Sequence, residues 1–97
     1  MTLPFFHPEA EEEMNAEADY YDEKHEDLGS DFLNEVHRVA IEAGRNPDHG
    51  SPFSRHTRRR HLRRFPHWLV YLPSEDGIKV IAVAHPSRRP GYWTQRL

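Results

Sequence analysis

The segment from Arg58 to Trp93 constrains the fold most, because it joins two apolar runs of strand length through a short polar turn. The runs are Trp68 to Leu72 and Ile78 to His85, and Ser74-Glu75-Asp76-Gly77 between them is typical of a hairpin turn. Arginines cluster at both ends of the segment. This layout predicts an antiparallel hairpin whose rims present guanidinium groups to an anionic partner, either nucleic acid or an acidic polypeptide.

The second run is apolar on both of its alternating faces, which is typical of a central strand covered on both sides. We expect helices on one side and the C-terminal tail, through Tyr92 and Trp93, on the other. A further strand is predicted at Thr57 to Arg63, after a loop-like stretch over residues 46–55. Simple alternation divides the second run into one face with Ile78, Val80, Ala82 and Ala84 and another with Ile81 and Val83.

The first half of the chain predicts one short strand and two helices. Leu3 to His7 is apolar and bounded by prolines, as suits an edge strand. Apolar residues then recur at helical spacing from Glu9 to about His25. We expect Leu28-Gly29-Ser30 to break this helix and Ser30 or Gly29 to cap a second one, which runs to about Ala43. The pattern predicts an α+β domain, with two N-terminal helices packed on a mostly antiparallel sheet.

Length and composition narrow the function classes. With 97 residues we expect residues 1–97 to form a single domain, and with no cysteine there is no disulfide, thiolate metal site or cysteine nucleophile. No apolar run reaches the roughly 18 residues of a membrane span, and no signal peptide is visible at the N-terminus. Eight histidines lack the spacing of a metal motif, so we expect no metal and no cofactor. We therefore expect a cytoplasmic protein.

Charge is divided unequally between the halves of the chain. Residues 1–48 hold 14 acidic and 3 basic side chains (−11), residues 49–97 hold 2 and 10 (+8), and the sum is the net charge of −3. Eleven of the 13 cations are arginines, which favour bidentate contacts with phosphate or carboxylate. Two explanations stay open: the basic half faces a partner, or the two halves pair with each other inside the fold.

Five segments of the chain stand in a specific order and spacing: FHPEAEEE at Phe6 to Glu13, YYDEKHEDLGSDFLNEV at Tyr20 to Val36, NPDHGSP at Asn46 to Pro52, RRRHLRRFPHWLVY at Arg58 to Tyr71, and IKVIAVAHPSRRPGYW at Ile78 to Trp93. In this order and spacing they resemble the RelE/ParE superfamily of type II toxin–antitoxin toxins, often labelled plasmid stabilisation proteins. The resemblance implies a β-α-α-β-β-β fold, growth inhibition, and neutralisation by a cognate antitoxin whose extended, acidic C-terminal segment wraps the toxin.

The resemblance implies two activities. RelE-like members are ribosome-dependent mRNA endoribonucleases, for which His85, Arg88, Arg89 and Tyr92 would be the catalytic candidates here. ParE-like members inhibit DNA gyrase by contact. Trp68 stands where nuclease members carry an arginine, and an indole cannot neutralise a phosphate. We therefore predict gyrase inhibition without catalysis, with the nuclease and a degenerate toxin that acts only as a binding partner as alternatives.

Four arginines are candidates for binding the antitoxin or the target: Arg58, Arg60, Arg63 and Arg64. Because strand alternation sends neighbouring side chains to opposite faces, some of them are also expected to pair with the acidic helices. Structural roles are open for other candidates as well. Trp68, Tyr71 and Trp93 have the character of core or core-rim aromatics, and His85 could simply end a strand.

Overall fold

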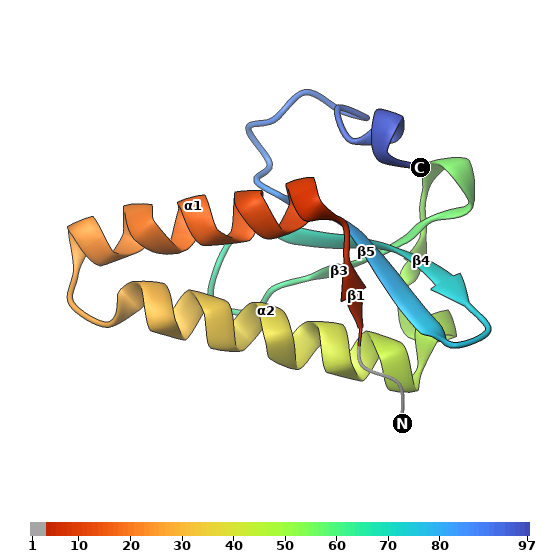
Figure 1. Ribbon diagram of the computed structural model, residues 1–97, viewed down its shortest axis with the longest axis horizontal. Coiled ribbons are helices and arrows are strands. Elements are labelled where there is room, and N and C mark those ends of the chain that lie inside the picture. Colours follow the sequence, from red (N-terminus) through yellow and green to blue (C-terminus); the bar gives the residue numbers. More distant parts are fainter. Residues whose placement is uncertain (1–3) are drawn as a thin grey trace.

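The computed structural model describes residues 4–97 and has an α+β fold, which confirms the predicted class (Figure 1). Its elements follow the predicted order with one addition, a short strand within the stretch expected to be a loop. In chain order they are β1 (Phe5–Phe6), α1 (Pro8–Lys24), α2 (Leu28–Arg45), β2 (Ser51–Pro52), β3 (Arg58–His61), β4 (Trp68–Ser74) and β5 (Gly77–Ala84), with short 3-10 turns at Pro47–His49, Ser54–His56 and Thr94–Arg96.

One five-stranded sheet has the order β1-β5-β4-β3-β2. The pairs β2–β3, β3–β4 and β4–β5 are antiparallel, whereas β1 pairs with β5 in parallel, with Phe5 opposite Lys79. The predicted edge strand is confirmed at Phe5–Phe6, whereas Leu3 lies outside the described residues. The predicted hairpin is also confirmed, because β4 pairs with β5 down to Ser74 opposite Gly77. Strand β5 lies inside the sheet, between β1 and β4, as its apolar sequence indicates.

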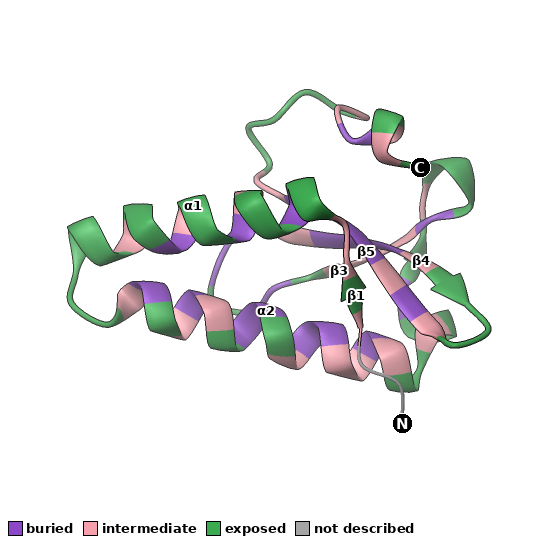
Figure 2. Cartoon of the chain, in the orientation of Figure 1, coloured by how far each residue is buried: buried purple, intermediate pink, exposed green. Residues whose placement is uncertain are grey.

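Both helices pack on one face of the sheet, and the C-terminal tail covers part of the other (Figures 1 and 2). The buried core between helices and sheet includes Phe32, Val36, Leu69 and Tyr71. A smaller cluster on the opposite face contains Trp93, which is 2% exposed, so the predicted cover by the tail is confirmed. No helix within residues 4–97 combines the length and apolar character needed to cross a membrane.

A β-bulge in β5 overturns the expected alternation of its side chains. Val70 of β4 pairs with Ala82, and the next residue, Tyr71, pairs with Val80, so Ile81 is the extra residue. A bulge shifts the residues beyond it to the opposite face. Ile78, Val80 and Val83 therefore belong to the helix-facing core, while Ile81 and Ala82 face the tail. The prediction that placed Ala82 with Val80 was wrong for this reason.

The helix break also lies elsewhere than predicted. Leu28, Gly29 and Ser30 are the first residues of α2, and the chain turns at His25–Asp27 instead. Asp27 is the residue before α2, with a left-handed φ of 66° and no side-chain capping bond. The Gly29 amide donates instead to Oδ1 of Asp22, at 2.8 Å, from the last turn of α1. The Asp22 carboxylate of α1 thus accepts a backbone N–H group at the N-terminus of α2. It takes the place of the predicted cap by Ser30 or Gly29.

Candidate functional site

A pocket of ≈200 Å³ opens on the tail-facing side of the sheet. One of its lining residues is Arg59 of β3, whose guanidinium carbon lies 4.1 Å from the ring centroid of Trp68 and 4.2 Å from that of Phe53. Such stacking places a cation between two aromatic faces. The pocket is lined by Phe53, Arg59, Trp68, Val70, Ala84, His85, Pro86, Arg88, Arg89, Pro90, Gly91, Tyr92 and Trp93.

All four residues proposed as nuclease candidates line this pocket, so the fold brings them together. His85 is directly after β5, and its Nδ1 lies 2.7 Å from Ser87 Oγ and accepts the Ser87 amide at 3.0 Å. The Arg88 guanidinium carbon stacks 3.9 Å from the ring centroid of Tyr92. Arg89 is exposed at the pocket edge. The roles assigned to these residues stay predictions.

The Tyr92 hydroxyl has an unusual environment for a proton carrier. Burial raises the pKa of its phenol well above the usual value, and the negative charge of Glu13 raises it further. A phenol with a raised pKa remains protonated at neutral pH, so it is a poor general base. It can still donate a hydrogen bond that orients a ligand. This environment therefore weakens the case for base catalysis by Tyr92.

Trp68 occupies the rim of the pocket, as expected for a core-rim aromatic, whereas Tyr71 and Trp93 are buried. Its indole packs against His61, with ring centroids 4.6 Å apart, and under Arg59. The guanidinium of Arg59 therefore lies over the Trp68 ring, at the position where the resemblance to nuclease members implies an arginine. Arg59 was not among the site residues predicted from the sequence. Its position between Arg58 and Arg60 was the available signal, because alternation sends its side chain to the other face of β3.

The four arginines proposed for partner binding make contacts within the chain. Arg58 donates to the carbonyls of Asp48, at 3.1 Å, and Gly50, at 2.7 Å. Arg60 pairs with Glu42 and Arg64 with Asp31, each at 3.4 Å. This confirms that part of the basic half pairs with the helices. These pairs are partly exposed and weak, so they leave partner binding at Arg60 and Arg64 as a prediction.

Arg63 differs from its neighbours because its backbone, not its side chain, makes the contact. Its amide donates to Glu35 Oε2 at 2.7 Å, and Arg38 donates to Glu35 Oε1 at 2.9 Å. Burial raises the pKa of the Glu35 carboxyl, but these hydrogen bonds outweigh it and hold the pKa below its usual value. The Arg63 side chain is exposed, and no ion pair to it occurs within residues 4–97. It is therefore the most available of the four for an acidic partner.

A second cluster of charged side chains was not predicted from the sequence because it joins the two ends of the chain. Arg96 of the tail donates to both oxygens of Glu13 on α1, at 2.9 and 3.0 Å, and to the Ile81 carbonyl at 3.1 Å. Glu13 also accepts the Val83 amide at 3.2 Å. These contacts fix the tail against α1 and β5 and thereby position Tyr92. No local pattern signals a pair separated by 83 residues.

Within residues 4–97 no group of three or more histidine, aspartate or glutamate side chains is arranged to hold a metal ion. A search of curated proteins finds no match to the chain. The family model described as "ParE toxin of type II toxin-antitoxin system, parDE" matches residues 5–90, which include both helices, all strands and the pocket residues up to Pro90. The chain therefore belongs to the ParE family of toxins of type II toxin–antitoxin systems.

Proposed function

We propose that this toxin arrests growth in the cytoplasm by binding DNA gyrase, without chemistry of its own, and that a cognate antitoxin with an acidic C-terminal segment neutralises it. The match to the ParE toxin model over residues 5–90 is the observation that carries the proposal. ParE-like members of the superfamily act by contact with gyrase, and the family implies an antitoxin partner.

The chemistry of the pocket supports contact rather than cleavage. RNA cleavage through the 2′-hydroxyl needs a base near that hydroxyl and free cations at the phosphate. The raised pKa of Tyr92 disfavours a tyrosinate, His85 Nδ1 is engaged by Ser87, and Arg88 lies 3.7 Å from Glu13. Contacts within the chain already engage these groups, which leaves them less available to act on a substrate.

A ribosome-dependent mRNA endoribonuclease is the second candidate, and one observation favours it. Arg59 lies on the indole of Trp68 and shares a pocket with His85, Arg88, Arg89 and Tyr92. A cation is therefore available beside the position where the sequence alone places only an indole. An aromatic and basic pocket of this kind suits stacking of a base and contact with a phosphate.

Target assays separate the two candidates. We expect the purified toxin to block gyrase supercoiling and to leave ribosome-bound mRNA intact, and we expect a His85→Ala and Tyr92→Phe double variant to arrest growth as strongly as the original chain. The double variant removes the two groups able to carry protons in the pocket. Cleavage of mRNA in the ribosomal A site, lost in the double variant, would establish the nuclease instead. A folded chain inactive in both assays would indicate the degenerate toxin.

Charge reversal at three of the candidate arginines tests the proposal of an acidic antitoxin segment. We expect Arg63→Glu to weaken the toxin–antitoxin complex by about tenfold and to reduce its dependence on salt, because one attractive charge pair becomes repulsive. Arg58→Glu and Arg60→Glu should act in the same direction, with an added loss of their internal contacts.

The affinity of each variant for the antitoxin is measured by calorimetry at two salt concentrations. Arg45→Glu is the matched control, because Arg45 is exposed at the end of α2. Equal affinities for the Arg63 and Arg45 variants would refute the assignment.

A further inference from the structure

The pocket that contains Arg59 and Trp68, called the Arg59 pocket below, crosses the face of the sheet that the helices do not cover (Figure 1). Arg59 of β3 pairs with Val70 of β4, and Trp68 of β4 pairs with Ala84 of β5, so three neighbouring strands supply its floor. The chain carries 16 acidic side chains, but none within residues 4–97 lines this pocket. It is therefore a basic surface on a protein whose net charge is negative.

Arg59 is a half-buried cation without an anionic partner in the described part of the chain. Its guanidinium lies between the rings of Phe53 and Trp68, which restrict its orientation. Its Nε is buried and has no hydrogen-bond partner within residues 4–97, and its side chain forms no ion pair there. A buried donor left unpaired costs stability, so its retention points to an acceptor that the chain itself does not supply.

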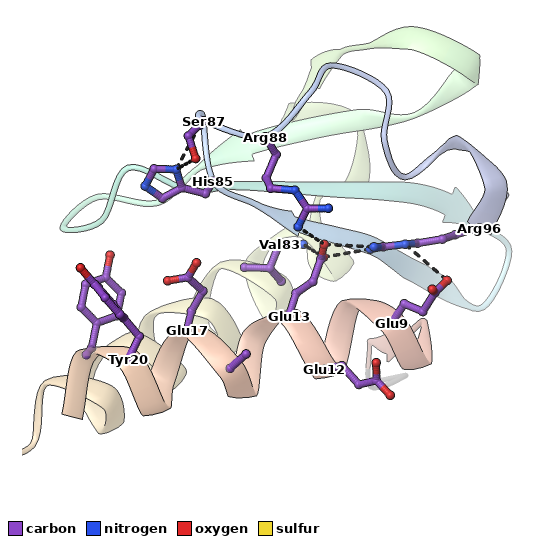
Figure 3. Close-up of a pocket in the computed structure, with 12 residues that line it drawn as sticks. Glu9, Glu12, Glu13, Glu17, Tyr20, Val83, His85, Ser87, Arg88 and Arg96 are labelled. Carbon is purple, nitrogen blue, oxygen red and sulfur yellow. Dashed lines mark hydrogen bonds and ion pairs between the residues drawn. The ribbon is translucent and has the colours of Figure 1, made fainter. Parts of the chain in front are cut away.

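Two further arginines line the Arg59 pocket, and they differ in their contacts. Arg88 points toward Glu13 of α1, 3.7 Å away, and is partly neutralised there (Figure 3). Arg89 is exposed, and residues 4–97 provide no ion pair for it. The pocket thus combines one half-buried and one exposed guanidinium that are both available to an anionic ligand.

A second hollow, of ≈540 Å³, adjoins the Arg59 pocket and shares Arg59 and Trp68 with it. Arg63 lines this hollow and forms no ion pair within residues 4–97. Glu42 also lines it, but its carboxylate already pairs with Arg60. Available arginines therefore extend over both hollows. This arrangement suits a ligand with repeated negative charges better than a single anion.

A nucleic-acid backbone fits this surface better than an acidic polypeptide does. An extended peptide gains affinity by adding a strand to the edge of a sheet, whereas the Arg59 pocket lies on the face of the sheet, across three strands. A phosphate backbone needs no pairing with the main chain. The planar guanidinium fork matches the oxygens of a phosphate, and contacts of this kind supply much of the affinity of protein–DNA complexes.

We propose that the Arg59 pocket binds a backbone phosphate of DNA, and that Arg63 and Arg89 contact neighbouring phosphates. The phosphate site rests on the geometry, whereas the choice of DNA rests on the proposed function, because DNA is the nucleic acid that gyrase holds. The toxin then contacts gyrase and its DNA together, through ion pairs and without cleavage. At Arg63 this surface overlaps the one proposed for the acidic antitoxin segment, so the antitoxin would exclude DNA from it.

Fluorescence anisotropy with the purified full chain and a short labelled DNA duplex tests the phosphate site. We expect Arg59→Gln to weaken binding by about tenfold and to reduce the slope of log affinity against log salt concentration by about one, because one phosphate contact is lost. Arg45→Gln removes a cation at the end of α2, outside both hollows, and should change neither quantity. Arg89→Gln alters an exposed side chain and should also reduce the slope, so the site stays testable if circular dichroism shows that Arg59→Gln is unfolded.

Four results would overturn the proposal. Absence of duplex binding, or equal affinities and slopes in the Arg59 and Arg45 variants, would remove the phosphate site. A glutamate peptide that binds as tightly as the duplex, and loses as much affinity in Arg59→Gln, would assign the pocket to an acidic polypeptide. Tighter binding of an RNA duplex of the same sequence would remove DNA as the ligand.

The link to gyrase is measured separately, with immobilised gyrase. We expect added DNA to raise the affinity of the toxin for gyrase, and we expect Arg59→Gln, but not Arg45→Gln, to remove this gain. A gain that persists in Arg59→Gln would exclude the pocket as the contact with DNA held by gyrase. A toxin that binds no gyrase would refute the proposed function and the choice of DNA with it, whereas the duplex titration still decides the phosphate site.

Discussion

Replacing Gly29 with alanine is expected to lower the free energy of unfolding by roughly 3 kcal/mol, because the close approach of α1 and α2 leaves no room for a methyl group. A Cβ atom at this position would collide with the backbone carbonyl oxygen of Ala18 and would lie 2.6 Å from Oδ1 of Asp22. The carbonyl belongs to the backbone of α1, so the helices would have to move apart. That movement would also stretch the bond from the Gly29 amide to Asp22.

Gly44 provides the matched control for this prediction. It lies in α2 like Gly29, but a Cβ atom there would meet nothing within 4 Å. Gly44→Ala should therefore raise the free energy of unfolding by up to about 1 kcal/mol, through helix propensity alone. Urea denaturation of both variants measures the difference. If Gly29→Ala and Gly44→Ala have the same free energy of unfolding, the predicted steric clash at Gly29 is wrong.

The same glycine explains why the helix boundary was mispredicted. In sequence terms, Gly29 and Ser30 combine a helix breaker with a capping residue, which favours a turn. In the structure, glycine serves helix packing, and a carboxylate from α1 replaces the local cap. Local propensity cannot distinguish a glycine that ends a helix from one that lets two helices touch. That distinction depends on residues of the other helix.

Helices and strands with a strong apolar periodicity could be predicted from the sequence, whereas features that depend on how strands pair with each other could not. The hairpin of β4 and β5 and the two helices follow from apolar spacing and turn residues. The bulge at Ile81 could not be predicted in this way. A strict alternation of faces assigns every residue of the strand to one face or the other, and it contains no signal for an extra residue. As a result the expected faces of β5 were right before the bulge, at Ile78 and Val80, and wrong after it.

The pocket was partly predictable for a similar reason. His85, Arg88, Arg89 and Tyr92 lie close in sequence after one strand, so their convergence follows from a short tail folding back. Arg59 comes from a different strand, and its stacking on Trp68 depends on the register of β3 with β4. The separation of charge along the chain left open whether its halves pair with each other or face a partner, and only the fold identifies the internal pairs, such as Arg60 with Glu42.

Arg96→Ala is expected to lower the free energy of unfolding by about 3 kcal/mol, because it leaves the largely buried carboxylate of Glu13 without its main partner. The Ile81 carbonyl would lose a donor as well. The contacts of Arg96 also hold the tail, so its loss should expose Trp93, which is 2% exposed in the structure. Urea denaturation measures the free energy of unfolding. Hydrogen exchange at the backbone amides of residues 94 and 96 measures the loosening of the tail.

Two variants show whether this effect comes from the Arg96–Glu13 pair. Arg96→Lys keeps the charge but not the planar fork, so it should lose less stability than Arg96→Ala while still falling below the original chain. Arg89→Ala removes an exposed cation from the same segment and should change the free energy of unfolding by no more than about 0.5 kcal/mol. If the tail of Arg96→Ala exchanges no faster than that of Arg89→Ala, the pair does not hold the tail. In that case Tyr92 and Arg88 must be positioned by the packing of Trp93 on Ile81 and Ala82, since these form the remaining buried contact between the tail and the sheet.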